Sequence, residues 1–122
     1  MPSYNAPLRD MRFVMDEVFD FAGSYAAHGL TDATPDLVDA VLEESAKFAS
    51  EVLAPLNRTG DEEGCHFEDG VVTTPKGFKE AYQQYVENGW AAMSGPVEYG
   101  GQGLPASLGL VGMELKVRGK RL

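Results

Sequence analysis

Apolar residues recur at three- and four-residue steps over residues 9–27, with acidic residues between them. The apolar positions are Met11, Val14, Met15, Val18, Phe19, Ala22 and Tyr25. This spacing predicts one amphipathic helix from about Arg9 to Ala27. Gly29 then provides a stop, because glycine adopts the left-handed conformation that often closes a helix.

A second helix is predicted from a start signal and a long apolar face. Thr34 can cap the helix, Pro35 fits its first position, and Asp36 suits the positive end of the helix dipole. One face carries Leu37, Val38, Val41, Leu42, Ser45, Phe48, Ala49, Val52 and Leu53. Pro55 is expected to bend or end this helix near Leu53.

The next stretch is predicted to be a polar connection over residues 57–73, with a tight turn on Asp69-Gly70 between two short extended arms. Thr74-Pro75 repeats the earlier start signal and predicts a third helix, which Asn88-Gly89 ends. Trp90 follows at once and is expected to anchor the turn in the core.

Residues 94–105 contain four glycines and two prolines, which predicts a shaped connection and neither a helix nor a central strand. A fourth helix is expected after Pro105, although Gly109 and Gly112 should weaken it. The pattern as a whole predicts an all-α domain of about four helices, with a short hairpin-like turn and a glycine-rich loop.

Composition narrows the classes of partner. The chain has 122 residues, 43% of them hydrophobic, and a net charge of −9. Its last seven residues hold four basic residues and no acid, so residues 1–115 carry a net charge of −13, which disfavours nucleic acid as a partner. The single cysteine, the absence of a secretory signal and the absence of a long apolar run predict a cytoplasmic protein without a membrane span.

Two weak chemical patterns are present. Residues 101–106 match the dinucleotide-binding spacing G-x-G-x-x-A, but that pattern needs a preceding strand and a later acid, so a backbone-shaping loop is the preferred interpretation. Cys65-His66 lies among acids, but no second pair stands at ligand spacing, so no metal site is assigned. The aromatic residues are interpreted as core, or as a face that meets further domains.

The run VLAPLNRTGDEEGCHFEDGVVTTPKGFKEAYQQYVENGW, followed by PVEYGGQGLP, resembles the N-terminal helical domain of acyl-CoA dehydrogenases. The opening YNAPLRDMRFVMDEVFDF is similar to the N-terminal extension of their long subgroup, which includes enzymes similar to 3-methylmercaptopropionyl-CoA dehydrogenase. The resemblance covers about residues 3–111. It divides the chain into an extension (1–33), the family's helical domain (34–115) and an atypical basic tail (116–122).

The resemblance implies α,β-dehydrogenation of fatty acyl-CoA thioesters with FAD as cofactor. It places the catalytic glutamate and most flavin contacts in later domains. The chain is therefore expected to be truncated or frame-shifted before the middle domain, to bind no FAD alone and to contain no catalytic residue. The resemblance assigns part of the wall of the acyl cavity to Tyr99, Gly100, Gly101 and Gly103.

A second hypothesis comes from a different class of protein. A small acidic helical module without a cofactor would work by binding another protein. On either hypothesis, an exposed apolar face is expected to allow homo-oligomers.

Overall fold

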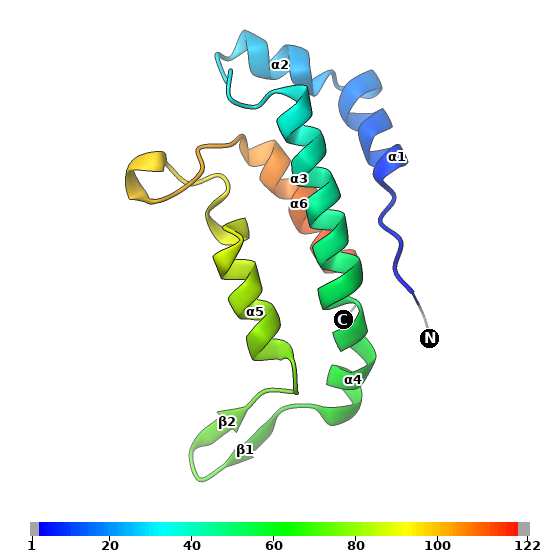
Figure 1. Ribbon diagram of the computed structural model, residues 1–122, viewed down its shortest axis with the longest axis vertical. Helices are drawn as coiled ribbons and strands as arrows, with labels where there is room; N and C mark the ends of the chain where they lie inside the picture. The colour runs from blue at the N-terminus through cyan, green and yellow to red at the C-terminus, as the bar shows by residue number, and fades with distance from the viewer. Residues whose placement is uncertain (1–2, 120–122) are drawn as a thin grey trace.

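The computed structural model describes residues 3–119, and these form an all-α fold with one small hairpin (Figure 1). The long α3 runs through the centre, α6 packs against it, and α5 lies beside it. The elements in chain order are α1 (Leu8–Arg12), η1 (Phe13–Val18), α2 (Phe21–Ala27), α3 (Pro35–Phe48), η2 (Ala49–Leu53), α4 (Pro55–Glu63), β1 (His66–Glu68), β2 (Val71–Thr73), α5 (Phe78–Glu87), η3 (Trp90–Ala92), η4 (Val97–Tyr99) and α6 (Ala106–Gly119).

The single helix predicted for residues 9–27 is wrong. The chain forms α1, a π-helical turn (η1) and α2, with a break at Asp20, whose φ is 46°. The Asp20 carboxylate accepts a hydrogen bond from the Gly23 amide at 3.1 Å and so caps α2. This local bond stabilises a left-handed conformation that is otherwise unfavourable for a residue with a side chain.

Polar contacts fix residues 3–33 to the rest of the domain. Arg12 of α1 forms ion pairs with Asp39 and Glu43 of α3, at 2.9 and 2.6 Å. Hydrogen bonds to Glu43 and Asp39 raise the pKa of Arg12. In α2, the Tyr25 hydroxyl lies 2.7 Å from the Ser107 hydroxyl of α6. The extension therefore contacts both helices of the core.

The start of α3 is confirmed, because the Thr34 hydroxyl accepts a hydrogen bond from the Leu37 amide at 3.2 Å. The predicted bend or end near Leu53 is confirmed, because η2 ends at Leu53 and a separate helix, α4, begins at Pro55. The π-helical turn η2 shifts the hydrogen-bond register, with the Ala54 amide donating to the Ala49 carbonyl at 2.9 Å. Pro55 then occupies the first turn of α4, where its missing N–H costs little. Residues 57–63 are consequently helical and not a polar loop.

The hairpin is confirmed. Strands β1 and β2 pair antiparallel, with Phe67 opposite Val72, and the turn residues Asp69 and Gly70 both have positive φ. Helix α5 begins at Phe78 and not at the predicted Thr74-Pro75, because Gly77 has a φ of 90° and cannot belong to the helix. Its predicted end is confirmed, with Asn88 as the C-cap and Gly89 at a φ of 75°.

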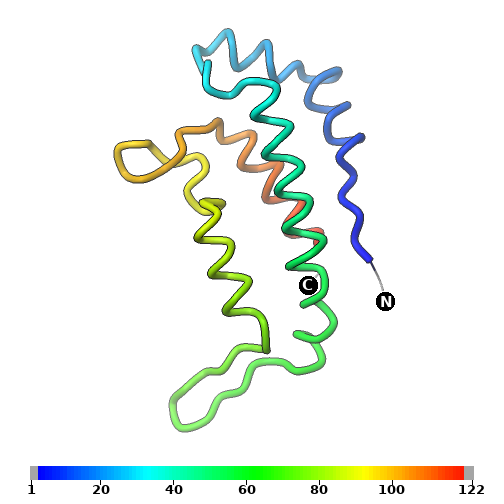
Figure 2. The backbone as a smooth tube through the Cα atoms, viewed as in Figure 1, coloured from blue at the N-terminus to red at the C-terminus, as the bar shows by residue number. Residues whose placement is uncertain are grey.

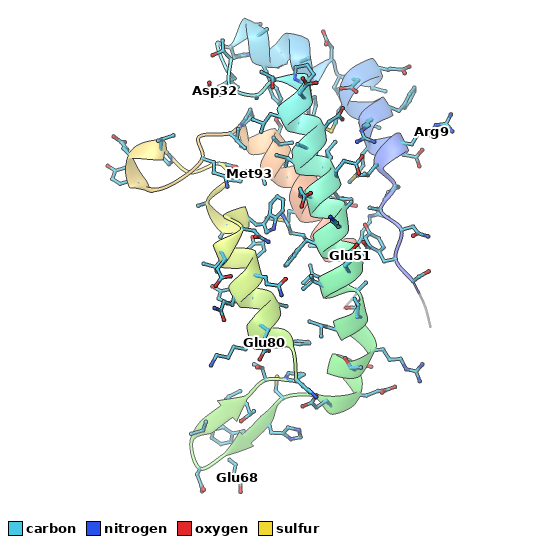
Figure 3. The ribbon with its side chains drawn as sticks, viewed as in Figure 1. Arg9, Asp32, Glu51, Glu68, Glu80 and Met93 are labelled. Atoms are coloured by element: carbon cyan, nitrogen blue, oxygen red, sulfur yellow. The ribbon has the colours of Figure 1, made fainter. Side chains whose placement is uncertain are left out.

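The core lies where α3 and α6 cross. Its buried cluster comprises Met15, Leu42, Met93, Leu104, Leu108 and Leu115. Figure 3 shows Met93 at the chain segment that follows α5, while the labelled acids Glu51, Glu68 and Glu80 are exposed on outer surfaces. Phe48 is buried, but Phe13, Phe19 and Tyr82 are exposed, so only part of the aromatic set is core.

The glycines of α6 permit close packing. Gly119 is buried, and a Cβ there would lie 3.0 Å from the Ala49 Cβ of η2, tighter than an ordinary contact, whereas a Cβ on Gly112 would meet the Ser45 hydroxyl of α3 at an ordinary 3.5 Å. Helix α6 also continues through Lys116 to Gly119, where the Asn57 side-chain amide donates to the Gly119 carbonyl at 2.6 Å. The change to a basic composition at Lys116 therefore does not coincide with the end of the helix.

Ser45 provides a test of this interface. Its hydroxyl is fully buried and has no hydrogen-bond partner among residues 3–119. We expect Ser45→Ala to raise the free energy of unfolding by about 1 kcal/mol, because it removes an unsatisfied buried hydroxyl and improves helix propensity. Urea unfolding followed by circular dichroism measures the change.

The matched control is Ser50→Ala. The Ser50 hydroxyl donates to the Ala46 carbonyl at 2.8 Å, so its removal loses a satisfied hydrogen bond. We expect a change within about 0.5 kcal/mol in this variant. Loss of stability in Ser45→Ala would show that its hydroxyl has a partner in solution.

Candidate functional site

The glycine-rich segment forms a loop that projects from the domain between α5 and α6 (Figure 2). Three backbone hydrogen bonds close its stem. The amides of Gln102, Gly103 and Leu104 donate to the carbonyls of Ala92, Gly95 and Met93, at 3.0, 2.9 and 3.0 Å. The stem is fixed to the core because Met93 and Leu104 are both buried.

Glycine is required at the point where the two arms of the loop, the segments at Gly95 and Gly101, approach each other. A Cβ on Gly101 would lie 2.1 Å from the carbonyl oxygen of Gly95, a distance that no side chain can tolerate. Gly100 and Gly103 have φ of 85° and 65°, which favours glycine at both positions. The backbone itself therefore defines the shape of the loop.

The tip of the loop exposes apolar surface. Tyr99 and Val97, on the 3-10 turn η4, are 83% and 72% exposed. The four predicted wall residues, Tyr99, Gly100, Gly101 and Gly103, all lie in this one loop. Chain proximity brings them together, and they form a projecting surface whose assignment to a cavity wall stays a prediction.

The dinucleotide alternative is contradicted by the structure. The residues before Gly101 form the 3-10 turn Val97–Tyr99, so no strand leads into the glycines. A nucleotide-binding turn of that type needs a strand before it and a helix after it. Residues 101–105 are accordingly a structural loop, and Ala106 begins α6.

No metal centre is found in the described part of the chain. No group of three or more His, Cys, Asp or Glu side chains in residues 3–119 is arranged to hold an ion. Cys65 is exposed and stands beside the hairpin. Within the same residues, every helix is too short or too polar to cross a membrane.

A groove beside the loop was not predicted from the sequence. Its volume is about 600 Å³. It is lined by Leu53, Tyr85, Trp90, Ala91, Met93, Ser94, Gly95, Ala106, Gly109, Leu110, Met113, Lys116 and Val117. The ammonium of Lys116 lies over the Trp90 ring, 4.2 Å from its centroid. The sequence indicates that Trp90 anchors a turn after a helix end, but only the fold shows that α6 faces Trp90 and Tyr85.

Comparison of the sequence with known proteins places the chain in a family. The sequence model of the family described as acyl-CoA dehydrogenase, N-terminal domain, matches residues 36–119. The chain is 38% identical over 113 residues to a 3-methylmercaptopropionyl-CoA dehydrogenase from Ruegeria pomeroyi, covering 93% of this chain and 19% of that protein. It is 33% identical over 91 residues to a butyryl-CoA dehydrogenase from Syntrophomonas wolfei, covering 71% and 15% respectively. The chain thus spans less than a fifth of the length of these curated relatives.

Proposed function

This chain belongs to the acyl-CoA dehydrogenase family through its N-terminal domain, and from that premise we propose that it is the helical N-terminal part of an FAD-dependent enzyme that oxidises acyl-CoA thioesters. Within that enzyme the glycine loop, with Tyr99, Gly100, Gly101 and Gly103, forms part of the wall of the acyl cavity. The proposal also includes an extension over residues 1–33, a basic tail over residues 116–122 and a cytoplasmic location.

The single observation that carries the proposal is the match of residues 36–119 to the family's N-terminal domain. The loop geometry supports it. A backbone that is closed by its own hydrogen bonds and projects beyond the core can approach an apolar chain closely, since glycine presents no side chain. Tyr99 and Val97 add exposed apolar surface at the tip.

The chemistry belongs to groups outside residues 3–119. Bound FAD would accept a hydride from the substrate. The described residues offer no strand-glycine-helix turn that would hold its diphosphate, so we assign it no ligand in this chain. The role proposed for the helical domain is to bind and orient the acyl chain and to exclude water.

A chimera tests the proposal. Residues 3–119 would replace the matching segment of the Ruegeria pomeroyi relative, and acyl-CoA-dependent reduction of an electron-accepting dye would be measured. We expect the chimera to bind FAD and turn over substrate, whereas the 122-residue chain alone shows neither. A well-folded, FAD-loaded chimera without detectable turnover would contradict the proposed role.

Exposed apolar residues favour one second candidate, a protein-interaction module that also forms homo-oligomers. Leu110, Met113 and Val117 on α6 are between 57% and 66% exposed. The two candidates differ in the DNA that follows codon 122. Coding sequence for a middle domain, in any frame, favours the enzyme, while its absence favours the module.

A further inference from the structure

Among residues 3–119, Lys116 is the only charged residue that lines the groove beside the loop. The apolar side of this groove comes from Leu53, Leu110, Met113 and Val117. Tyr85 on α5 is the other titratable residue in the lining. A single amine thus lies within an otherwise neutral groove built from three parts of the chain.

The Lys116 side chain is held in place by aromatic rings. Its Nζ lies 4.2 Å from the centroid of Trp90 and 5.6 Å from that of Tyr85. None of the ion pairs found in residues 3–119 includes Lys116, whereas the nearby acid Glu114 pairs with Arg118. The amine therefore has a defined position and no carboxylate partner in the part of the chain that the structure describes.

Two effects act on the charge of this amine. Burial in the groove disfavours the ammonium and lowers the pKa of Lys116 to about 8. The faces of Trp90 and Tyr85 favour the ammonium and act in the opposite direction. No Asp or Glu is among the described residues that line the groove, and the nearby Glu114 pairs with Arg118, so a substantial neutral fraction of Lys116 is expected at mildly alkaline pH.

We propose that Lys116 is a site of N-acylation by acyl thioesters, whose acyl chain lies along the apolar side of the groove. The neutral amine attacks the thioester carbonyl, a C–N bond forms, and the C–S bond breaks. The thiol leaves as thiolate and receives the proton that the amine loses, so the products are an amide and a free thiol. No electron is transferred. The inference stands independently of the proposed enzyme function.

The groove explains why this lysine would differ from the others. Lys47, Lys76 and Lys79 are exposed to solvent. At pH 8 a lysine with an ordinary pKa is only about 0.4% neutral, whereas one with a pKa near 8 is about half neutral. A less basic amine is also a weaker nucleophile, which offsets part of this advantage. We therefore expect Lys116 to react at least about tenfold faster than each exposed lysine.

The first experiment uses the 122-residue chain and butanoyl-CoA at pH 8, with peptide mass spectrometry to give the acylation rate of each lysine. The proposal expects the rate at Lys116 to exceed those at Lys47, Lys76 and Lys79 and to level off above pH 8.5. Equal or slower reaction at Lys116, or a rate still rising steeply at pH 9.5, would overturn it. Unfolding in urea is expected to abolish the preference.

A matched pair of variants separates charge from packing. Met113 lines the groove three residues before Lys116, so Met113→Glu places a carboxylate next to the amine. The carboxylate raises the pKa of Lys116, and we expect acylation at pH 8 to fall about fivefold or more. Met113→Gln loses the same apolar contact without gaining the charge, so it is the reference for the charge effect, and we expect it to be acylated about fivefold faster than Met113→Glu at pH 8. Equal rates in the two variants would contradict the proposal, and Lys116→Arg confirms the peptide assignment.

Discussion

Leu108→Ala is expected to lower the free energy of unfolding by about 2–5 kcal/mol, a large fraction of the stability of a domain of this size. Leu108 is fully buried and belongs to the cluster between α3 and α6. Its neighbours in that cluster come from η1, α3 and the loop stem, so collapse around the missing atoms would require several elements to move. We therefore place the cost toward the upper part of the range.

The control lies two residues further along the same helix. Leu110 is 66% exposed, and Leu110→Ala is expected to change stability by no more than about 0.5 kcal/mol. Urea unfolding followed by circular dichroism and by Trp90 fluorescence measures both variants. Similar losses in the two would mean that α6 packs with a different face toward the core.

Much of the fold could be predicted because local chemistry determines it. Thr34 caps α3 through its own hydroxyl, Asp69-Gly70 supplies the two positive φ angles of a tight hairpin, and Asn88-Gly89 closes α5. Each signal acts over three or four residues. The all-α class follows from them, and the structure and the family match confirm it.

The errors arose where a local bond or a register shift overrides the periodic pattern. The apolar spacing continues across Asp20, so nothing in it shows that the carboxylate would cap a new helix there. At Pro55 the sequence shows a helix breaker. The π-helical turn before it shifts the register of the backbone hydrogen bonds, so the N–H that Pro55 lacks does not end the helical path. Gly77 delays α5 because its backbone conformation is left-handed.

The candidate site likewise has one part that the sequence predicts and one part that it does not. The glycine loop was predicted from its residues alone, since Gly and Pro restrict the backbone wherever they occur. The groove around Lys116 could not be predicted from the sequence, because it depends on α6 lying across Trp90 and Tyr85. In the sequence, Lys116 was part of a basic tail; in the fold, it lies in a groove next to the core.

Gly101→Ala is expected to break the shape of the glycine loop. The new methyl group would lie 2.1 Å from the Gly95 carbonyl oxygen, so the two arms of the loop must separate. This separation strains the Gly103-to-Gly95 hydrogen bond and its neighbours in the stem. Overpacking of this kind costs about 1–3 kcal/mol. Hydrogen exchange at the amides of Gln102, Gly103 and Leu104 should accelerate, and thermal unfolding should occur at a lower temperature.

Gly95→Ala is the matched control because it alters the other side of the same contact. A Cβ on Gly95 has its nearest neighbours at 3.5 Å, an ordinary contact, and Gly95 does not have a positive φ. We expect its hydrogen exchange to match that of the parent, with stability unchanged or raised by a few tenths of a kcal/mol. If both variants weaken the stem equally, glycine is needed there for flexibility and not for close approach. The wall proposed for the acyl cavity would then be mobile, and in the chimera both variants should lose turnover together.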